Sequence, residues 1–168
     1  MIIDAHSHWL PEKIINNAHF FHKGWSDIEA QVKMMEESGI SKAVLSYPTS
    51  DAHLKLGSIS EVATIYNNNI AKILKQYPDK FIGAAILPVD NSEDMIEELK
   101  HVTEELGFKA VSLATSYNSK YLDDKIFLPI YSLAQEQNLP IFVHSQIVNP
   151  IGFERVQDPL LTPKSLLL

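Results

Sequence analysis

The sequence has no cysteine among its 168 residues. This absence excludes disulfide bonds, zinc sites built on thiolates and catalysis by a thiol nucleophile, and it fits a reducing compartment. Basic residues are also few, since 14 Lys and Arg stand against 21 Asp and Glu, which gives a formal net charge of -7. A nucleic acid or an anionic membrane needs a clustered basic surface, so this charge argues against both as partners.

Long hydrophobic runs are missing as well. The longest, at residues 81–89, falls far short of the roughly 20 residues that a transmembrane helix needs. The N-terminus lacks the basic segment followed by an apolar one that marks a secretory signal. With 45% hydrophobic and 21% charged residues, the composition is typical of a globular protein. We therefore expect a single domain over residues 1–168, located in the cytoplasm.

The sequence does contain an alternation of apolar strands and amphipathic helices. Five strands are expected to begin near residues 2, 42, 81, 109 and 140, with apolar residues at helical spacing between them. Ser26 and Glu29 have the spacing of a capping box, Ser92 is a second expected N-cap, and Gly39 and Gly107 stand where helices end. Strands that are apolar on both faces, alternating with helices, predict an α/β fold with a parallel sheet covered by helices.

Histidines stand at the C-terminal ends of two of these strands. His6 and His8 follow the apolar start of the first strand, and His144 ends the fifth. Residues two apart on a strand point to the same face, so both imidazoles can reach one ion. The simpler interpretation is one hydrogen-bonded and one solvated histidine in the pair, with His144 bonded to backbone in the core. Asp4 shares the face of His6 and His8, either as a structural carboxylate or as a ligand.

Two architectures fit this order of elements: a doubly wound open sheet and a (β/α)8 barrel. The doubly wound fold needs a glycine loop after its first strand to hold phosphate, and residues 6–11 read His-Ser-His-Trp-Leu-Pro, without glycine. A barrel carries its catalytic side chains at the C-terminal ends of several strands, where these histidines stand. The pattern therefore favours a TIM-type (β/α)8 barrel.

The barrel is expected to be incomplete. A complete one typically takes roughly 250 residues, so this chain is predicted to hold only about the first five βα units, with the C-terminal units missing. The alternative is a genuine five-stranded domain. Five strands of an unclosed barrel leave two unpaired edges, which would favour a homo-oligomer formed through those edges.

Four stretches of the chain, taken in order, match the pattern of one enzyme group. Residues 4–8 read Asp-Ala-His-Ser-His, with a proline three residues later. Residues 81–88, residues 107–131 and residues 139–144 correspond to a third strand, a fourth strand with its helix, and a fifth strand ending in histidine. Together they resemble the amidohydrolase superfamily, and within it the branch of aminocarboxymuconate semialdehyde decarboxylase and related decarboxylases and hydrolases.

The resemblance implies a metal-dependent barrel enzyme whose metal ligands are His6, His8 and His144. It implies one divalent ion, because residues 112–115 read Ser-Leu-Ala-Thr where members with two ions carry a bridging lysine or glutamate. Zinc is the first choice, since it tolerates three protein ligands plus water in an open site. The family's later histidine and aspartate have no counterpart before Leu168, so the catalytic residues are expected beyond it.

The expected function is that of a metal-dependent hydrolase or decarboxylase, acting on a small carboxylate or carbonyl substrate through a metal-activated water. Residues at strand ends are candidate substrate contacts, although such residues are more often packing or turn residues: Trp9, Tyr47, Thr49, Tyr117 and Asn118. The alternative enzyme is a metal-dependent phosphoesterase or nuclease, which the lack of a second-metal ligand disfavours. The alternative outside catalysis is an incomplete metal-binding domain that binds or assembles.

Overall fold

The computed structural model describes residues 1–17, 22–48, 56–117 and 120–145 of the chain. Five parallel strands form one sheet: β1 (Ile3–Ser7), β2 (Lys42–Leu45), β3 (Phe81–Ala85), β4 (Ala110–Ala114) and β7 (Ile141–His144). Their order in the sheet is their order in the chain. The five strands predicted from the sequence are therefore confirmed.

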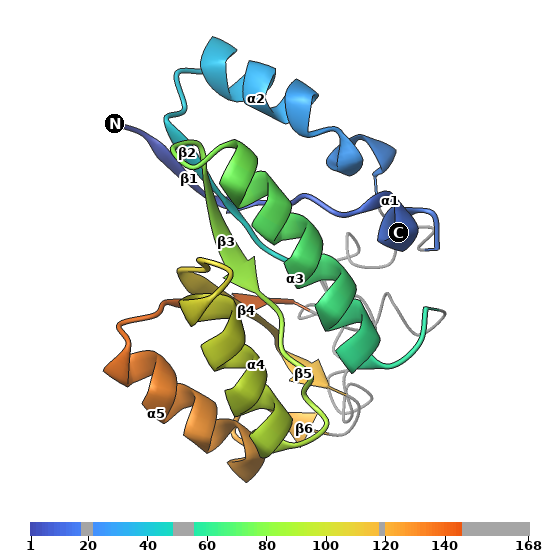
Figure 1. The fold of residues 1–168 in the computed structure, drawn as a ribbon, viewed down its shortest axis with the longest axis vertical. Helices are drawn as coiled ribbons and strands as arrows, with labels where there is room; N and C mark the ends of the chain where they lie inside the picture. Colours follow the sequence, from blue (N-terminus) through green and yellow to red (C-terminus); the bar gives the residue numbers. More distant parts are fainter. Residues whose placement is uncertain (18–21, 49–55, 118–119, 146–168) are drawn as a thin grey trace, which may run out of the picture.

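Helices connect consecutive strands. They are α1 (Glu12–Ile15), the 3-10 helix η1 (Lys23–Ser26), α2 (Ile28–Glu37), α3 (Ile59–Gln76), α4 (Ser92–Glu104), the 3-10 helix η3 (Lys125–Phe127) and α5 (Leu128–Glu136). A short antiparallel pair, β5 (Ser116–Tyr117) and β6 (Lys120–Tyr121), follows β4 and is not predicted by the sequence pattern. Figure 1 shows α2, α3, α4 and α5 succeeding one another along the sheet in chain order.

The strand order decides between the two architectures. A doubly wound sheet reverses direction at its first strand, whereas here each new strand is added beside the preceding one, always at the same edge. Right-handed crossovers wound in one direction place the connecting helices on one side of the sheet. This is the winding of a (β/α)8 barrel, and the prediction of a partial barrel is confirmed.

The two faces of the sheet bury different sets of side chains. Ala43 and Leu45 of β2 belong to the large core that the sheet shares with the helices. Val44, which lies between them, instead packs with Ala84 and Ala110 of the next two strands. Because neighbouring residues of a strand point to opposite faces, this second cluster marks the inner face of the barrel.

The sheet is strongly curled. β1 and β7 are its outermost strands, and in a flat sheet four inter-strand spacings of about 4.8 Å would separate them by about 19 Å. The ring centroids of His6 in β1 and His144 in β7 nevertheless lie 5.3 Å apart. Two imidazole side chains are too short to span the flat distance, so the C-terminal ends of the two strands approach each other across the inner face.

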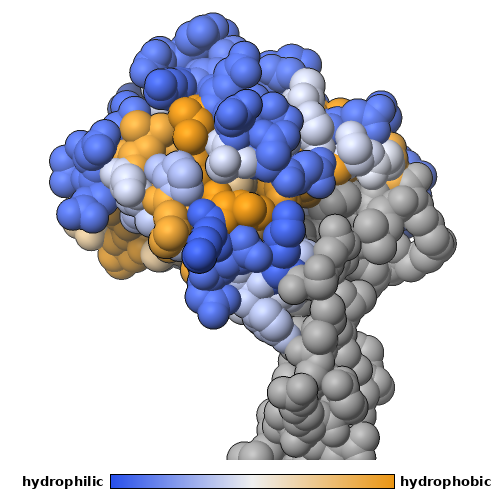
Figure 2. All heavy atoms as spheres, turned by 90° about the horizontal axis from the view of Figure 1, so that it is seen from below, coloured by the Kyte–Doolittle hydropathy of each residue, from blue (hydrophilic) through white to orange (hydrophobic). Residues whose placement is uncertain are grey.

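The surface combines polar helices with apolar side chains near the sheet's two outer strands. Figure 2 shows hydrophobic residues exposed between hydrophilic ones on the face seen from below. Ile2 and Ile3 are 59% and 43% exposed at the start of β1, and Val143 of β7 is 54% exposed. Self-association through these strands stays a prediction.

Within the described part of the chain, every helix is too short or too polar to cross a lipid bilayer.

Two of the predicted helix starts are wrong by one residue. Asp27, not Ser26, caps α2, since its carboxylate accepts the backbone N–H of the third helical residue at 2.9 Å. Asn91, not Ser92, caps α4 in the same way at 2.9 Å. Asp, Asn and Ser are comparable N-caps, so residue type could not choose between neighbours. The predicted helix ends are confirmed, with positive φ at Gly39 and Gly107.

The corrected cap can be tested by unfolding. Replacing Asp27 by Ala is expected to lower the free energy of unfolding by about 1 kcal/mol, because it removes the acceptor for an α2 backbone N–H. Ser26→Ala is the matched control, with an expected cost below about 0.5 kcal/mol, since the Ser26 hydroxyl only donates to the Lys23 carbonyl within η1. Urea unfolding followed by circular dichroism measures both, and a larger loss for Ser26→Ala would contradict the assignment.

Candidate metal centre

Three imidazoles converge at the C-terminal rim of the sheet. His6 lies in β1, His8 directly follows it, and His144 is the last residue of β7. The ring centroids are 4.8 Å apart for His6 and His8, 5.3 Å for His6 and His144, and 5.2 Å for His8 and His144. The nitrogens able to bind an ion all lie within 4.8 Å of one another. The structure thus brings together the three residues that the sequence predicted as ligands.

An irregularity in β1 shapes this rim. Asp4 pairs with Ala43 and Ser7 with Leu45, so three steps along β1 oppose two along β2. Such a bulge re-aims side chains and is common next to functional sites. The Asp4 carboxylate accepts the backbone N–H of His6 at 3.0 Å, which holds the bulged segment. Asp4 lies beside the histidines, but it is not one of the three converging ligands.

The separation of the imidazoles fits a divalent ion. Nε2 of His6 and Nε2 of His8 are 3.1 Å apart. Two nitrogens bound at 2.0–2.1 Å to one tetrahedral ion lie about 3.3 Å apart, so this pair is already at ligand spacing. The ligand atoms of all three histidines, His144 included, lie within 4.8 Å of one another. Three nitrogen ligands leave a coordination position open for a further group.

The surroundings of His8 favour its neutral form. Burial lowers the pKa of His8, and the charges of His144 and His6 lower it further, against the opposing effects of the bond to Ser46 and the charge of Asp4. Nδ1 of His8 is 2.9 Å from the Ser46 backbone oxygen. The Trp25 ring covers His8, with centroids 5.0 Å apart and planes tilted by 52°. A neutral imidazole is the form that can bind a metal ion.

A groove of about 430 Å³ opens beside His6 and His8. It lies between β1 and the η1–α2 segment, and its volume is in the range of small-molecule sites. Sequence reasoning missed most of its lining, because residues of η1 and α2 are far from β1 in the chain and carry no motif. The lining residues are Asp4, His6, Ser7, His8, His22, Gly24, Trp25, Asp27, Ala30, Gln31 and Met34.

Three of the predicted substrate contacts, Trp9, Tyr47 and Tyr117, are not among the residues that line this groove. Trp9 is half-buried, and its indole N–H donates to the last backbone carbonyl of η1 at 3.1 Å. Tyr47 and Tyr117 are buried and line a separate, small pocket of about 10 Å³. Thr49 and Asn118 lie outside the described residues. The role of these residues in substrate binding stays a prediction.

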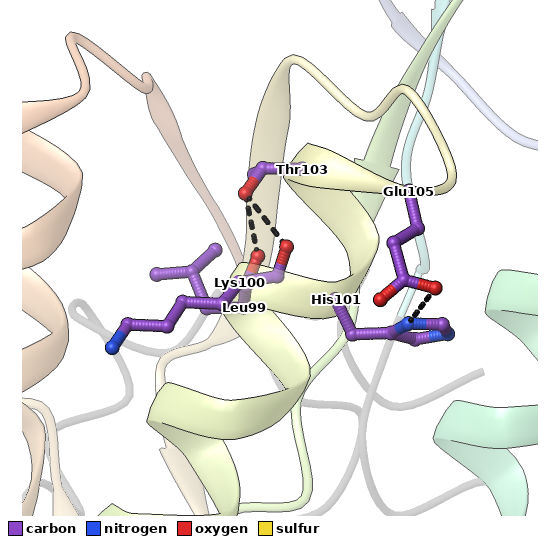
Figure 3. Close-up of polar contacts among 5 residues, drawn as sticks. All are labelled: Leu99, Lys100, His101, Thr103 and Glu105. Carbon is purple, nitrogen blue, oxygen red and sulfur yellow. Dashed lines mark hydrogen bonds and ion pairs between the residues drawn. The ribbon is translucent and has the colours of Figure 1, made fainter.

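Two further histidines have local partners. His22 accepts the backbone N–H of Gly24 through Nδ1 at 3.1 Å. His101, on α4, pairs with Glu105 one turn later, with Nδ1 and Oε2 3.3 Å apart, and Figure 3 shows this pair on one side of the helix. The interpretation of His101 as a solvated helix residue is confirmed by its 41% exposed side chain.

The histidine centre and the barrel winding can now be compared with known proteins. Residues 3–163 match the family model described as amidohydrolase. The chain belongs to the amidohydrolase family. This amidohydrolase is 31% identical over 84 residues to the 2-amino-3-carboxymuconate-6-semialdehyde decarboxylase of Dictyostelium discoideum, covering 50% of this chain and 23% of that one.

Solved structures agree with the fold. The crystal structure of 4-oxalomesaconate hydratase from Rhodopseudomonas palustris is 30% identical, with a TM-score of 0.66 over 88% of this amidohydrolase and 53% of the hydratase. A dihydroxybenzoic acid decarboxylase from Polaromonas sp., solved with bound manganese and the inhibitor 2-nitroresorcinol, is 23% identical. Its TM-score is 0.71 over 92% of this chain and 52% of that chain.

The chain spans about half the length, or less, of these relatives, since the matches cover 23% to 53% of them. The family predicted from the sequence is therefore confirmed, and so is the partial barrel. The assignment of His6, His8 and His144 as metal ligands stays a prediction, to which the structure adds their convergence.

Proposed function

We propose that this amidohydrolase contributes His6, His8 and His144 to the divalent metal centre of a decarboxylase or hydratase that acts on a small carboxylate. The observation that carries the proposal is the convergence of three imidazoles, within 4.8 Å, from the two outermost strands of the sheet. Single histidines bonded to backbone carbonyls are common structural features, but three imidazoles that meet at a barrel's C-terminal rim favour a metal site.

The chain's own residues prepare the ligands. Nδ1 of His8 faces the Ser46 carbonyl and Nδ1 of His144 faces the Ser145 carbonyl, each at 2.9 Å. Because a carbonyl only accepts, each Nδ1 carries the hydrogen, and each Nε2 keeps the lone pair that binds a metal. When bound, a divalent ion would supply a Lewis acid for a substrate oxygen and would acidify a water.

The groove suits a small carboxylate beside this centre. Trp25 and Met34 provide apolar contact area, while Gln31 and His22 provide polar groups along the same wall. A pocket that combines apolar walls with a few polar groups orients a small ligand while excluding water. A carboxylate bound in this groove would lie next to His6 and His8, which also line it.

The ion's identity follows from the complete ligand set. Imidazole ligands suit zinc, whereas carboxylate and water ligands shift the preference toward manganese. The three ligands on this chain thus favour zinc, and manganese is the ion in the related Polaromonas decarboxylase.

Two reactions compete as the chemistry of the centre. Loss of carbon dioxide is favoured by the relatives named as decarboxylases. Addition of water is the second candidate, because the hydratase from Rhodopseudomonas palustris is 30% identical over 88% of this chain. The described residues contain no second group of three metal-binding side chains, which disfavours the phosphoesterase or nuclease alternative. A cytoplasmic location and hydrolysis stay predictions.

Metal binding is the first test. After chelator treatment, the protein is expected to take up about one Zn²⁺ or Mn²⁺ per chain, because three imidazoles form one site. His6→Ala and His144→Ala should each weaken metal binding by more than about 100-fold. Losing a residue that only hydrogen-bonds to a metal ligand already changes metal affinity by about 10- to 100-fold. Elemental analysis and competition with a chromophoric chelator measure this. His101→Ala is the control, and equal binding by His144→Ala would contradict the proposal.

Tryptophan fluorescence offers an independent readout of the same site. Zn²⁺ is expected to change the emission of Trp25, whose ring centroid lies 5.0 Å from that of His8. Trp25→Phe should abolish the response, and Trp9→Phe should preserve it, because the Trp9 indole N–H is bonded to the Ser26 carbonyl instead. A response that survives in Trp25→Phe but not in Trp9→Phe would place the ion elsewhere.

The reaction is tested on metal-loaded protein. With 2,6-dihydroxybenzoate, the decarboxylase proposal predicts metal-dependent release of carbon dioxide that His144→Ala reduces by at least about 100-fold. With an unsaturated keto dicarboxylate, the hydratase proposal predicts incorporation of oxygen-18 from labelled water. If protein with bound metal turns over neither substrate, the catalytic assignment to this chain is wrong. That result would not contradict the metal site.

A further inference from the structure

One ligand of the proposed centre, His8, contacts two atoms of the same buried residue, Ser46. Nδ1 of His8 lies 2.9 Å from the backbone oxygen of Ser46 and 3.4 Å from the Ser46 hydroxyl. That hydroxyl is also 3.2 Å from the backbone oxygen of Ser7. A backbone oxygen can only accept, so the hydroxyl donates its single hydrogen to Ser7. Its lone pairs are then directed at His8, and both Ser46 atoms that face Nδ1 are acceptors.

This arrangement selects one tautomer of the imidazole. With two acceptors beside it, Nδ1 carries the hydrogen, and in a neutral ring Nε2 keeps the lone pair. Nε2 of His8 is the atom that lies 3.1 Å from Nε2 of His6. Ser46 therefore determines which nitrogen of His8 is presented to the cluster.

Ser46 is itself held from two sides. Its backbone N–H donates to the Ser7 oxygen at 2.9 Å, so Ser7 receives both the amide and the hydroxyl of Ser46. The Ser7 hydroxyl in turn accepts from the side-chain amide of Gln31 on α2. Ser46 is only 4% exposed, and water does not compete for bonds at that depth. A continuous set of hydrogen bonds thus runs from α2 through the ends of β1 and β2 to His8.

We propose that Ser46 is a positioning residue of this centre: its backbone oxygen selects the tautomer of His8, and its hydroxyl, bonded to Ser7, holds the His8 ring in its orientation. The inference rests on the proposed function, in which His8 binds the metal. The Ser46 carbonyl would remain in a Ser46→Ala variant, so the hydroxyl's own contribution can be measured. Residues that hydrogen-bond to metal-bound histidines typically contribute about 10- to 100-fold to metal affinity.

The sequence contains a matched control for removing this hydroxyl. Ser112, in β4, is 2% exposed, and its hydroxyl donates to a backbone oxygen, that of Tyr47, at 3.2 Å. Ser46 and Ser112 therefore lose the same kind of buried bond when changed to Ala. Only the Ser46 hydroxyl also faces an imidazole, so a difference between the two variants reports the effect on His8.

The first measurement is the tautomer in metal-free protein. Nitrogen-15 histidine spectra at about pH 8, where imidazoles are neutral, are expected to show His8 with its hydrogen on Nδ1, and His8→Gln identifies its signals. Ser46→Ala should shift the Nδ1 resonance of His8, because the ring loses one of its two acceptors, while the Ser46 backbone oxygen keeps the hydrogen on Nδ1. Ser112→Ala should leave the resonance unchanged. An unchanged His8 spectrum in Ser46→Ala, or a His8 with its hydrogen on Nε2 in the unaltered protein, would overturn the inference.

The second measurement is Zn²⁺ affinity by chelator competition. Ser46→Ala is expected to bind at least about 10-fold more weakly than the unaltered protein, Ser112→Ala to match it, and Ser46→Thr, which keeps the hydroxyl, to restore binding. Should Ser46→Ala fail to fold, Gln31→Met can be used instead. It removes the hydrogen bond from Gln31 to the Ser7 hydroxyl and should also weaken Zn²⁺ binding, by a smaller factor. No Zn²⁺ binding by the unaltered protein would defeat the proposed function, whereas equal binding by all variants would defeat only the role of Ser46.

Discussion

The curl of the parallel sheet is the constraint on which the rest of this structure depends. His6 and His8 come from one outermost strand and His144 from the other, yet their rings lie within 5.3 Å of one another. Only a sheet bent toward its inner face allows this, because flat strands at these positions would stand about 19 Å apart. Crossovers of one hand keep the helices outside, and small inner residues such as Ala84 and Ala110 leave room for the bend.

The two sides of the histidine cluster are built differently. On the β1 side, hydrogen bonds from Gln31, Ser7 and Ser46 link helix α2 to His8. On the β7 side, the bond described for His144 is to the carbonyl of the next residue, Ser145. The ring of His8 is therefore connected through hydrogen bonds to helix α2, which lies far from it in the chain.

Much of the fold could be predicted from local patterns. Apolar runs located all five strands, and glycine located two helix ends, because strand and helix periodicity and positive φ are properties of a few adjacent residues. The caps were misplaced at Ser26 and Ser92, since neighbouring polar residues compete for the same N–H groups. The pair β5 and β6 was missed because its two-residue strands are too short to show a period.

The sequence alone was sufficient for the family, the alternation of strands and helices, and the three histidines at strand ends, because these depend on residue type and spacing along the chain. The tertiary structure alone decided that the histidines meet, that Trp25 lies against His8 and that the Ser46 carbonyl contacts Nδ1 of His8. Apart from the His6–His8 pair, those contacts join residues 17 to 138 positions apart in the chain. They exist only once parallel pairing and curl have brought the strand ends together, and no local pattern encodes the distance between two strands that are not neighbours.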